Sequence, residues 1–388
     1  MEKEHRAGRF IKQQSGPSEY VAFIPAPLPP DPPICLDAPL QETLERASIA
    51  LGRLDGITLL LPNPDLFLYM YVRKEAVFSS QIEGTQSSLS DLLLFENDAA
   101  PSVPTEDVQE VSNYIAATQH GLKRLREGFP LSLRLIREIH GVLLKGTRGS
   151  NKTPGEFRRS QNWIGGTRPG NAKYVPPPPE EMLKALDNLE KLFYDQPVRT
   201  PPLIKAGLVH AQFETIHPFL DGNGRLGRLL ITFLLCVEGI LSQPLLYLSL
   251  YLKEHRGKYY ESLQQIRTEG DWEGWLRFYL QGVSEVAQQA TETARRIMHL
   301  FEEDRERIHR IGKAAGSALR VYDLLTHKAV VSIPAAAKRL EMAQPTVASA
   351  IQRLIKMGIL REFTGKRRDR QFLYPHYLDI LNEGVQKE

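Results

Sequence analysis

Residues 217 to 228 gather side chains that could do chemistry on a phosphate. The stretch is His-Pro-Phe-Leu-Asp-Gly-Asn-Gly-Arg-Leu-Gly-Arg, and an apolar run typical of a buried helix extends from Asn223 to about Val237. Gly222 and Gly224 allow the backbone to approach an anion closely. Because the N–H groups at a helix start favour negative charge, we expect a phosphate to bind there.

The charged side chains of this stretch have complementary chemistry. Arg225 and Arg228 are three residues apart, so both can reach phosphate oxygens from one helix face. Asp221 would repel a bare phosphate, so we interpret it as a ligand for a bridging divalent cation, with Mg²⁺ as the expected ion. His217 can take a proton from an attacking hydroxyl. Singly, each residue is more often structural; the complete set at fixed offsets favours a nucleotide site.

The stretch resembles the Fic-family signature H-x-F-x-[DE]-G-N-G-R-x-x-R without a departure. Fic proteins typically transfer AMP from ATP to a target side-chain hydroxyl and release pyrophosphate. The resemblance implies that His217 is the base, that Asp221 binds Mg²⁺, and that the two arginines contact the β- and γ-phosphates. It also assigns ATP binding to the residues around them, namely Gly222, Asn223, Gly224, Arg225, Leu226, Gly227 and Arg228.

A second motif ends a helix predicted from Asp65 toward Ser80. Ser79, Glu83 and Gly84 match the pattern [ST]-x-x-x-E-[GN], which resembles the inhibitory motif of Fic proteins. A carboxylate at Glu83 would pair with Arg228 and compete with the γ-phosphate, which leaves the α-phosphorus wrongly aimed for attack. The alternative is a surface acid before a glycine helix stop. We expect an enzyme that inhibits itself.

Two further segments carry predicted binding residues. Residues 158–166 and 172–175 are predicted as short strands around a turn, resembling the Fic flap, with Trp163, Ile164, Gly165 and Gly166 as target-binding residues. An open strand edge can pair with an extended target segment, although a hairpin that only packs on helices is the alternative. Family resemblance places the adenine near a helix predicted from Tyr251 to about Ile266, so we assign His255 to it; a surface histidine is the alternative.

Composition limits the class of protein. The chain has 388 residues, 42% of them hydrophobic, which is enough for two or three domains. Its net charge of +3 predicts no global attraction to nucleic acid or to an anionic membrane. Cys35 and Cys236 lie far apart and suggest neither a disulfide nor a zinc site. Because the longest apolar run is too short to span a bilayer, we expect a soluble cytoplasmic protein.

The expected fold is mostly α-helical. We predict a Fic-type helical bundle with a β-hairpin flap, followed by a C-terminal winged helix-turn-helix domain. The predicted segments are an N-terminal helical region with the inhibitory helix (1–125), the catalytic core (126–285), a connecting helix (286–312) and the winged helix-turn-helix domain (313–388). The proline-rich residues 25–33 are predicted as an extended surface connector, because proline cannot continue a helix or pair in a ladder.

The C-terminal segment resembles a winged helix-turn-helix. Helices are predicted at 332–340 and 345–357, and strands at 360–363 and 371–374. The second helix could enter a major groove while a basic loop contacts phosphates. The candidate DNA-binding residues are Arg353, Lys366, Arg367 and Arg368. Winged helices also serve as protein-interaction and dimer modules, so a homodimer is the alternative partner arrangement.

These features together favour a protein adenylyltransferase. It would use Mg²⁺ and ATP to modify a Ser, Thr or Tyr hydroxyl of a target protein, itself included, with Glu83 pairing to Arg228 as a brake. One alternative is a hydrolase that removes AMP from a modified protein, in which Glu83 orients a water. A second is a DNA-binding transcriptional regulator that only senses ATP. The signature predicts phosphate binding more clearly than it predicts the group attached to the phosphates. The identity of the donor nucleotide therefore stays open.

Overall fold

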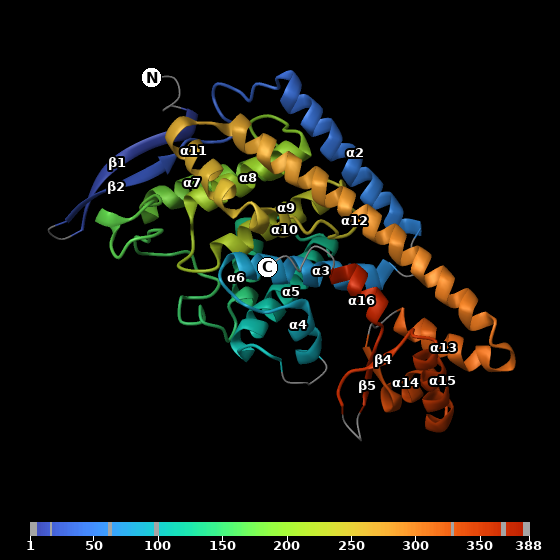
Figure 1. Cartoon of the computed structure of the whole chain (residues 1–388). Coiled ribbons are helices and arrows are strands. Elements are labelled where there is room, and N and C mark those ends of the chain that lie inside the picture. The colour runs from blue at the N-terminus through green and yellow to red at the C-terminus, as the bar shows by residue number, and fades with distance from the viewer. Residues whose placement is uncertain are drawn as a thin grey trace. The chain divides into compact units, whose positions relative to one another are not determined.

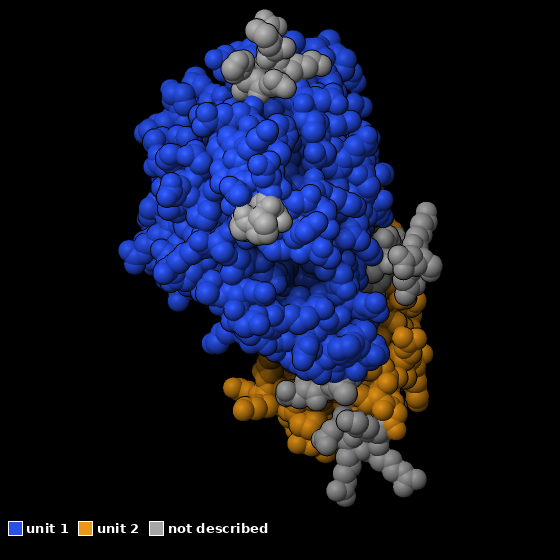
Figure 2. Space-filling model, turned by 90° about the vertical axis from the view of Figure 1, so that its left-hand side faces the viewer, with its two compact units in different colours: residues 1–55, 71–288 blue, residues 56–70, 289–388 orange. Residues whose placement is uncertain are grey.

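A computed structural model describes residues 6–15, 18–60, 64–96, 101–326, 330–365 and 370–382. The chain divides into two compact units (Figure 2). The first unit comprises residues 1–55 and 71–288, and the second comprises residues 56–70 and 289–388. All residues of the predicted nucleotide site belong to the first unit.

The chain is mostly helical (Figure 1). The helices that lie in the first unit, wholly or in part, are α2 (Ala38–Leu60), α3 (Pro64–Ile82), α4 (Leu89–Phe95), α5 (Thr105–Arg126), α6 (Leu133–Leu143), α7 (Pro179–Phe193), α8 (Pro202–Ile216), α9 (Asn223–Val237), α10 (Ser249–Glu254), α11 (Arg256–Glu269) and α12 (Trp272–His309). A short 3-10 turn, η1, covers Pro169–Asn171. The helix predicted from Asn223 to about Val237 is present as α9.

Helices α8 and α9 form the centre of the first unit (Figure 1). Both are buried over nearly their whole length, and residues such as Phe213, Leu226 and Phe233 are fully buried. Gly207 of α8 allows a close approach by α12, because a Cβ there would lie 2.9 Å from the ring of Tyr279. The loop between α8 and α9, which carries the signature, is therefore held by two buried helices.

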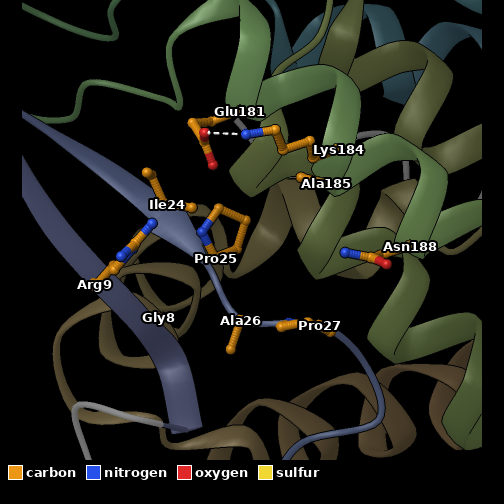
Figure 3. Close-up of a pocket in the computed structure, with 10 residues that line it drawn as sticks. All are labelled: Gly8, Arg9, Ile24, Pro25, Ala26, Pro27, Glu181, Lys184, Ala185 and Asn188. Carbon is orange, nitrogen blue, oxygen red and sulfur yellow. Dashed lines mark hydrogen bonds and ion pairs between the residues drawn. The ribbon is translucent and has the colours of Figure 1, made fainter.

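A β-hairpin precedes the helices. β1 (Gly8–Ser15) pairs antiparallel with β2 (Ser18–Pro25), with Phe10 opposite Phe23. Figure 3 shows the end of the hairpin beside α7, around a pocket whose lining includes the Lys184 and Glu181 side chains, 2.7 Å apart. The alternation of polar and apolar residues around β2 was the sequence signal for this hairpin, which we did not predict.

Two predicted elements need correction. The helix expected from Tyr251 to about Ile266 is interrupted at His255, whose φ of −107° and ψ of 33° are not helical, so α10 and α11 are separate helices. The proline-rich connector does not lie entirely on the surface, because the Leu28 side chain is buried. An apolar side chain gains free energy by leaving water even where its backbone is irregular.

The second unit contains α13 (Ala315–Leu325), α14 (Ile333–Leu340), α15 (Gln344–Lys356) and α16 (Pro375–Asn382), with the short turn η2 (Gly312–Ala314). Its strands β3 (Val330–Ser332), β4 (Arg361–Glu362) and β5 (Gln371–Leu373) pair antiparallel in the order β3-β5-β4. The winged helix interpretation of this arrangement stays a prediction. Within the described part of the chain, no helix is both long and apolar enough to cross a membrane.

Candidate active site

The signature loop is shaped by its own backbone and by Asn223. Helix α8 ends at His217 in the left-handed region (φ 50°), and Gly222 (φ 77°) begins α9. The Asn223 side chain accepts from the Phe219 N–H and donates to the Phe219 carbonyl, both at 2.8 Å. Asn223 was predicted to belong to a phosphate cradle. Its buried amide fixes the shape of the loop, and its part in binding phosphate stays a prediction.

Arg158 and Asn162 hold the same loop from outside. Arg158 Nε donates to the His217 carbonyl at 3.0 Å, and Asn162 Nδ2 donates to the carbonyls of His217 and Phe219 at 3.2 and 3.0 Å. Arg158 is buried. Neither role was predicted, because nothing in the sequence distinguishes Arg158 from its exposed neighbour Arg159.

The surroundings of His217 fit the role of base that was predicted for it. Its Nδ1 is buried and has no hydrogen-bond partner among the described residues. Burial, together with the nearby charges of Arg267 and Arg158, lowers the pKa of His217 to about 4. The imidazole is therefore neutral at pH 7 and has a lone pair available for a proton.

His140 of α6 supports Asp221. Its Nδ1 accepts from the Gly155 N–H at 2.8 Å, so the proton must lie on Nε2, which donates to the Asp221 carbonyl at 3.0 Å. The ring also stacks on Phe219 with centroids 3.7 Å apart. Burial lowers the pKa of His140 to about 4, which agrees with this neutral form. The Asp221 side chain remains 42% exposed, so its carboxylate can reach a ligand.

Arg225 bridges two carboxylates. Its Nη1 lies 3.1 Å from Glu110 Oε2, and its Nη2 lies 3.4 Å from Asp221 Oδ1. Glu110 comes from α5 and is buried. The contact between Glu110 and Arg225 was not predicted, since the two residues lie 115 positions apart in the chain.

Arg228 is held by the predicted inhibitory motif. Its Nε donates to Ser79 Oγ at 2.8 Å, and its Nη2 donates to the Ser79 carbonyl at 2.9 Å and to Glu83 Oε1 at 2.7 Å. Burial by itself would raise the pKa of Glu83, but the charge and hydrogen bond of Arg228 outweigh it and lower that pKa. The carboxylate is thus ionised and paired.

Glu83 also covers the helix start. A Cβ built on Gly224 would overlap the Glu83 carboxylate. Gly224 therefore brings the backbone close to an anion, as predicted, but the anion beside it here is Glu83. A carboxylate and a phosphate are both suited to the N-terminal end of a helix.

Leu226 and Gly227 face away from this position. The Leu226 side chain is fully buried and its N–H donates to the Gly222 carbonyl at 3.0 Å, so it offers no group to ATP. A Cβ on Gly227 would lie 2.7 Å from Glu214 Oε1 of α8. Gly227 allows α8 and α9 to pack closely, and the ATP contact predicted for both residues stays a prediction.

His255 is exposed and packs on Tyr251, with ring centroids 4.3 Å apart. One helical turn later, Tyr259 is buried, and its hydroxyl lies 2.9 Å from His210 Nε2. No described contact joins His255 to the signature, and its assignment to adenine stays a prediction.

The predicted flap does not form two strands. Ile164 and Tyr174 make a single antiparallel bridge, with the Ile164 N–H 2.8 Å from the Tyr174 carbonyl. Gly165 and Gly166 have φ of 70° and 74°, which is incompatible with a continued ladder. Tyr174 anchors the segment by donating to the Thr215 carbonyl of α8 at 2.6 Å. Trp163 is 39% exposed beside this bridge.

The side chains at the site fit a cation that is held partly by the protein and partly by the phosphates of a substrate. Among the described residues, no three His, Cys, Asp or Glu side chains gather to bind a metal ion by themselves. Asp221 offers one accessible carboxylate, and Mg²⁺ is commonly bound through one or two carboxylates together with substrate phosphates and water.

The candidate DNA-binding residue Arg353 lies on α15 and is partly exposed. Lys366, Arg367 and Arg368 lie outside the described residues.

Fold and site together define a helical domain with an anion-binding helix start and a histidine beside it. Residues 41–123 match the Fic/DOC family N-terminal model, and residues 130–235 match the Fic/DOC family model. The fold also resembles the crystal structure of a Fic family protein from Desulfovibrio desulfuricans G20, with a TM-score of 0.59 and 17% identity over 88% of this chain and 97% of that one. Residues 41–123 and 130–235 of this chain are therefore similar to the Fic/DOC family.

Curated relatives extend this comparison. The chain is 30% identical over 250 residues to a protein adenylyltransferase Fic from Aedes aegypti, covering 63% of this chain and 46% of that protein. It is 33% identical over 217 residues to one from Drosophila erecta, covering 53% of this chain and 40% of that protein. The chain thus spans less than half the length of these relatives.

Proposed function

We propose that this protein is an adenylyltransferase that moves AMP from ATP to a hydroxyl of a protein. The observation that carries the proposal is the neutral His217 beside an anion-binding helix start that also presents Asp221, Arg225 and Arg228. The names of the relatives support the same activity.

In the proposed reaction, the target hydroxyl gives its proton to His217 and its oxygen attacks the α-phosphorus of ATP. The bond from that phosphorus to the bridging oxygen breaks, and pyrophosphate leaves. The α9 helix start holds phosphate oxygens through its backbone N–H groups. When bound at Asp221, Mg²⁺ would neutralise charge on the leaving phosphates. Such transfer depends mainly on positioning and electrostatic stabilisation.

We further propose that Glu83 inhibits this reaction. Its carboxylate occupies the position beside Gly224 and pairs with Arg228, so both the helix start and the arginine are engaged. Before the triphosphate can bind in a productive geometry, the Glu83 side chain must leave this position. The enzyme would then be weakly active until α3 or its last turn moves.

Removal of AMP is the alternative for the same site. In that case Glu83 would orient a water rather than block a phosphate, and the Glu83→Gly variant would lose AMP release from a modified protein. A matched assay on a pre-modified target therefore separates the two roles.

The test is transfer from α-labelled ATP with Mg²⁺ onto the protein itself and onto a cell lysate. We expect Glu83→Gly to increase labelling by about tenfold or more over the wild type, since one charged hydrogen bond contributes roughly one to two orders of magnitude. Ser79→Ala keeps Glu83 but removes one bond to Arg228, so we expect a smaller increase.

His217→Ala in the Glu83→Gly background is the matched control and should abolish labelling. If Glu83→Gly binds ATP yet labels no protein in either sample, the proposed transfer is wrong. Labelling that persists in the His217→Ala variant would show that His217 is not the base.

A further inference from the structure

Glu110 is a buried carboxylate that contacts the candidate site without belonging to the signature. It lies on α5, one helical turn after Glu106, and each of its two oxygens meets a different arginine. Oε2 lies 3.1 Å from Arg225 Nη1, and Oε1 lies 2.8 Å from Arg148 Nε. A carboxylate removed from water is costly unless it is paired in this way.

The contact partners of Glu110 form a continuous chain of charges. Arg148 also approaches Asp107 Oδ1 at 3.4 Å, and Asp107 Oδ2 accepts from the Gln86 N–H at 2.9 Å. At the other end, Arg225 reaches Asp221 Oδ1 at 3.4 Å. The chain therefore connects the segment after the inhibitory motif to the carboxylate expected to bind the cation.

This arrangement changes the role expected of Arg225. Its guanidinium lies between two carboxylates, so its positive charge is largely balanced within the protein. Its buried Nε has no hydrogen-bond partner among the described residues. A balanced arginine contributes less to attraction of a triphosphate than to orientation of the groups it touches.

Resting on the proposed function, we propose that Glu110 is a positioning residue that holds Arg225 against Asp221 and so prepares the carboxylate for Mg²⁺-bound ATP. Glu110 touches no substrate itself. Its removal would leave Arg225 free to rotate. Asp221 Oδ1 would keep the Gly222 N–H at 2.6 Å but lose its contact with Arg225. The effect is therefore expected on the Mg²⁺-dependent part of nucleotide binding.

The experiment measures ATP affinity by calorimetry, with and without Mg²⁺, in the full chain carrying Glu83→Gly and His217→Ala so that ATP enters but is not consumed. Adding Glu110→Gln should weaken the Mg²⁺-ATP Kd by about tenfold or more. The Kd for ATP in excess chelator should stay within about twofold, and half-saturation should require more Mg²⁺.

Glu106→Gln is the matched control, because it removes the same charge from an exposed position one turn earlier on α5. It should leave the Mg²⁺-ATP Kd within about twofold. Glu110→Asp keeps the charge on a shorter side chain and should recover part of the affinity. If Glu110→Gln lowers Tm enough to indicate misfolding, Glu110→Asp tests the proposal instead. The expected result for Glu110→Asp is an intermediate Mg²⁺-ATP Kd.

Two results would overturn the inference while leaving the proposed function in place. One is an unchanged Mg²⁺-ATP Kd in both Glu110 variants. The other is an equal loss with and without Mg²⁺, which would mean a general structural effect. A background protein that binds no ATP under either condition would instead overturn the proposed function, and this inference with it.

Discussion

At the scale of single residues, His217 combines an unusual backbone conformation with an unusual environment. Its left-handed φ of 50° ends α8 abruptly and directs the chain into the signature loop. The strain of such a conformation in a non-glycine residue is tolerated where surrounding contacts determine it. Here Arg158 and Asn162 supply those contacts by binding the His217 carbonyl.

The environment of His217 predicts the pH dependence of activity. A general base works only when deprotonated, and burial lowers the pKa of His217 to about 4 from 6.5. The labelling rate of Glu83→Gly should therefore stay nearly constant from pH 7 down to about pH 5 and fall as the pH approaches 4. A rate that falls by half near pH 6.5 would show that burial does not depress this pKa. Initial rates measured across that range, with ATP saturating at each pH, provide the check.

At the scale of elements, α3 (Pro64–Ile82) and the turn that follows it present three polar residues at intervals of four. Glu75, Ser79 and Glu83 share one helix face. Glu75 accepts hydrogen bonds from Tyr114 of α5 at 3.0 Å and from the Ser249 N–H of α10 at 3.1 Å. Ser79 and Glu83 bind Arg228 of α9. Helix α3 and the turn after it are thus attached along two turns, and their displacement requires more than the loss of one ion pair.

Glu75 predicts a pH-dependent contribution to stability. Burial raises the pKa of Glu75 from 4.5 to about 7, so the folded protein retains a proton that the unfolded chain has lost. Stability therefore falls as the pH rises from about 4.5 to about 7. Replacing Glu75 by Gln removes this titration. The free energy of unfolding of the variant, relative to wild type, should rise by up to about 3 kcal/mol between pH 4.5 and 7.

Urea unfolding at pH 4.5, 5.5 and 7 measures this difference for Glu75→Gln. Glu180→Gln, at an exposed position of α7, is the control and should show the same pH dependence as wild type. A relative stability of Glu75→Gln that does not change with pH would contradict the prediction. Hydrogen bonds that the glutamine amide of Glu75→Gln gains or loses change the free energy of unfolding equally at all three pH values. They therefore do not affect the test.

At the scale of the whole molecule, the second unit offers a surface unrelated to the nucleotide chemistry. The buried residues Val347, Ala350, Ile351 and Leu354 fix one face of α15 against its unit. The opposite face exposes polar side chains that can hydrogen-bond to other molecules, namely Gln344, Thr346, Ser349 and Gln352, with Arg353 partly exposed beside them. We propose that this face binds duplex DNA, with a second copy of the chain as the alternative partner.

DNA binding by this surface predicts a salt dependence. Affinity for a mixed-sequence duplex, followed by fluorescence anisotropy, should fall by about tenfold or more between 50 and 200 mM salt if several phosphates are contacted. Neutralising Arg367 and Arg368 should reduce the salt slope by about two, and Arg353→Ala by about one if it contacts a phosphate. Absence of binding at 50 mM salt would contradict the proposal, and concentration-dependent dimerisation lost with Arg353→Ala would favour the second copy.

Much of the site was accessible from the sequence because its parts are local or belong to short motifs. The bounds of α9 and the helix start beside Gly222 and Gly224 were expected from residue type and spacing. The pairing of Glu83 with Arg228 was expected from the resemblance to the Fic inhibitory motif. Residue type and spacing were less informative about the direction in which each residue of the signature points. Asn223, Leu226 and Gly227 belong to the signature, yet the structure turns them toward the loop or the neighbouring helix.

Only the tertiary structure decided which distant residues complete the site. Glu110 lies 115 positions before Arg225, and His140 lies 81 before Asp221. Their roles depend on how α5 and α6 pack around α9, and spacing along a chain carries no information on such packing. The shifted pKa values of His217 and Glu75 have the same origin. Residue type determines which group can titrate, whereas burial and neighbouring charges, which exist only in the folded protein, determine where it does.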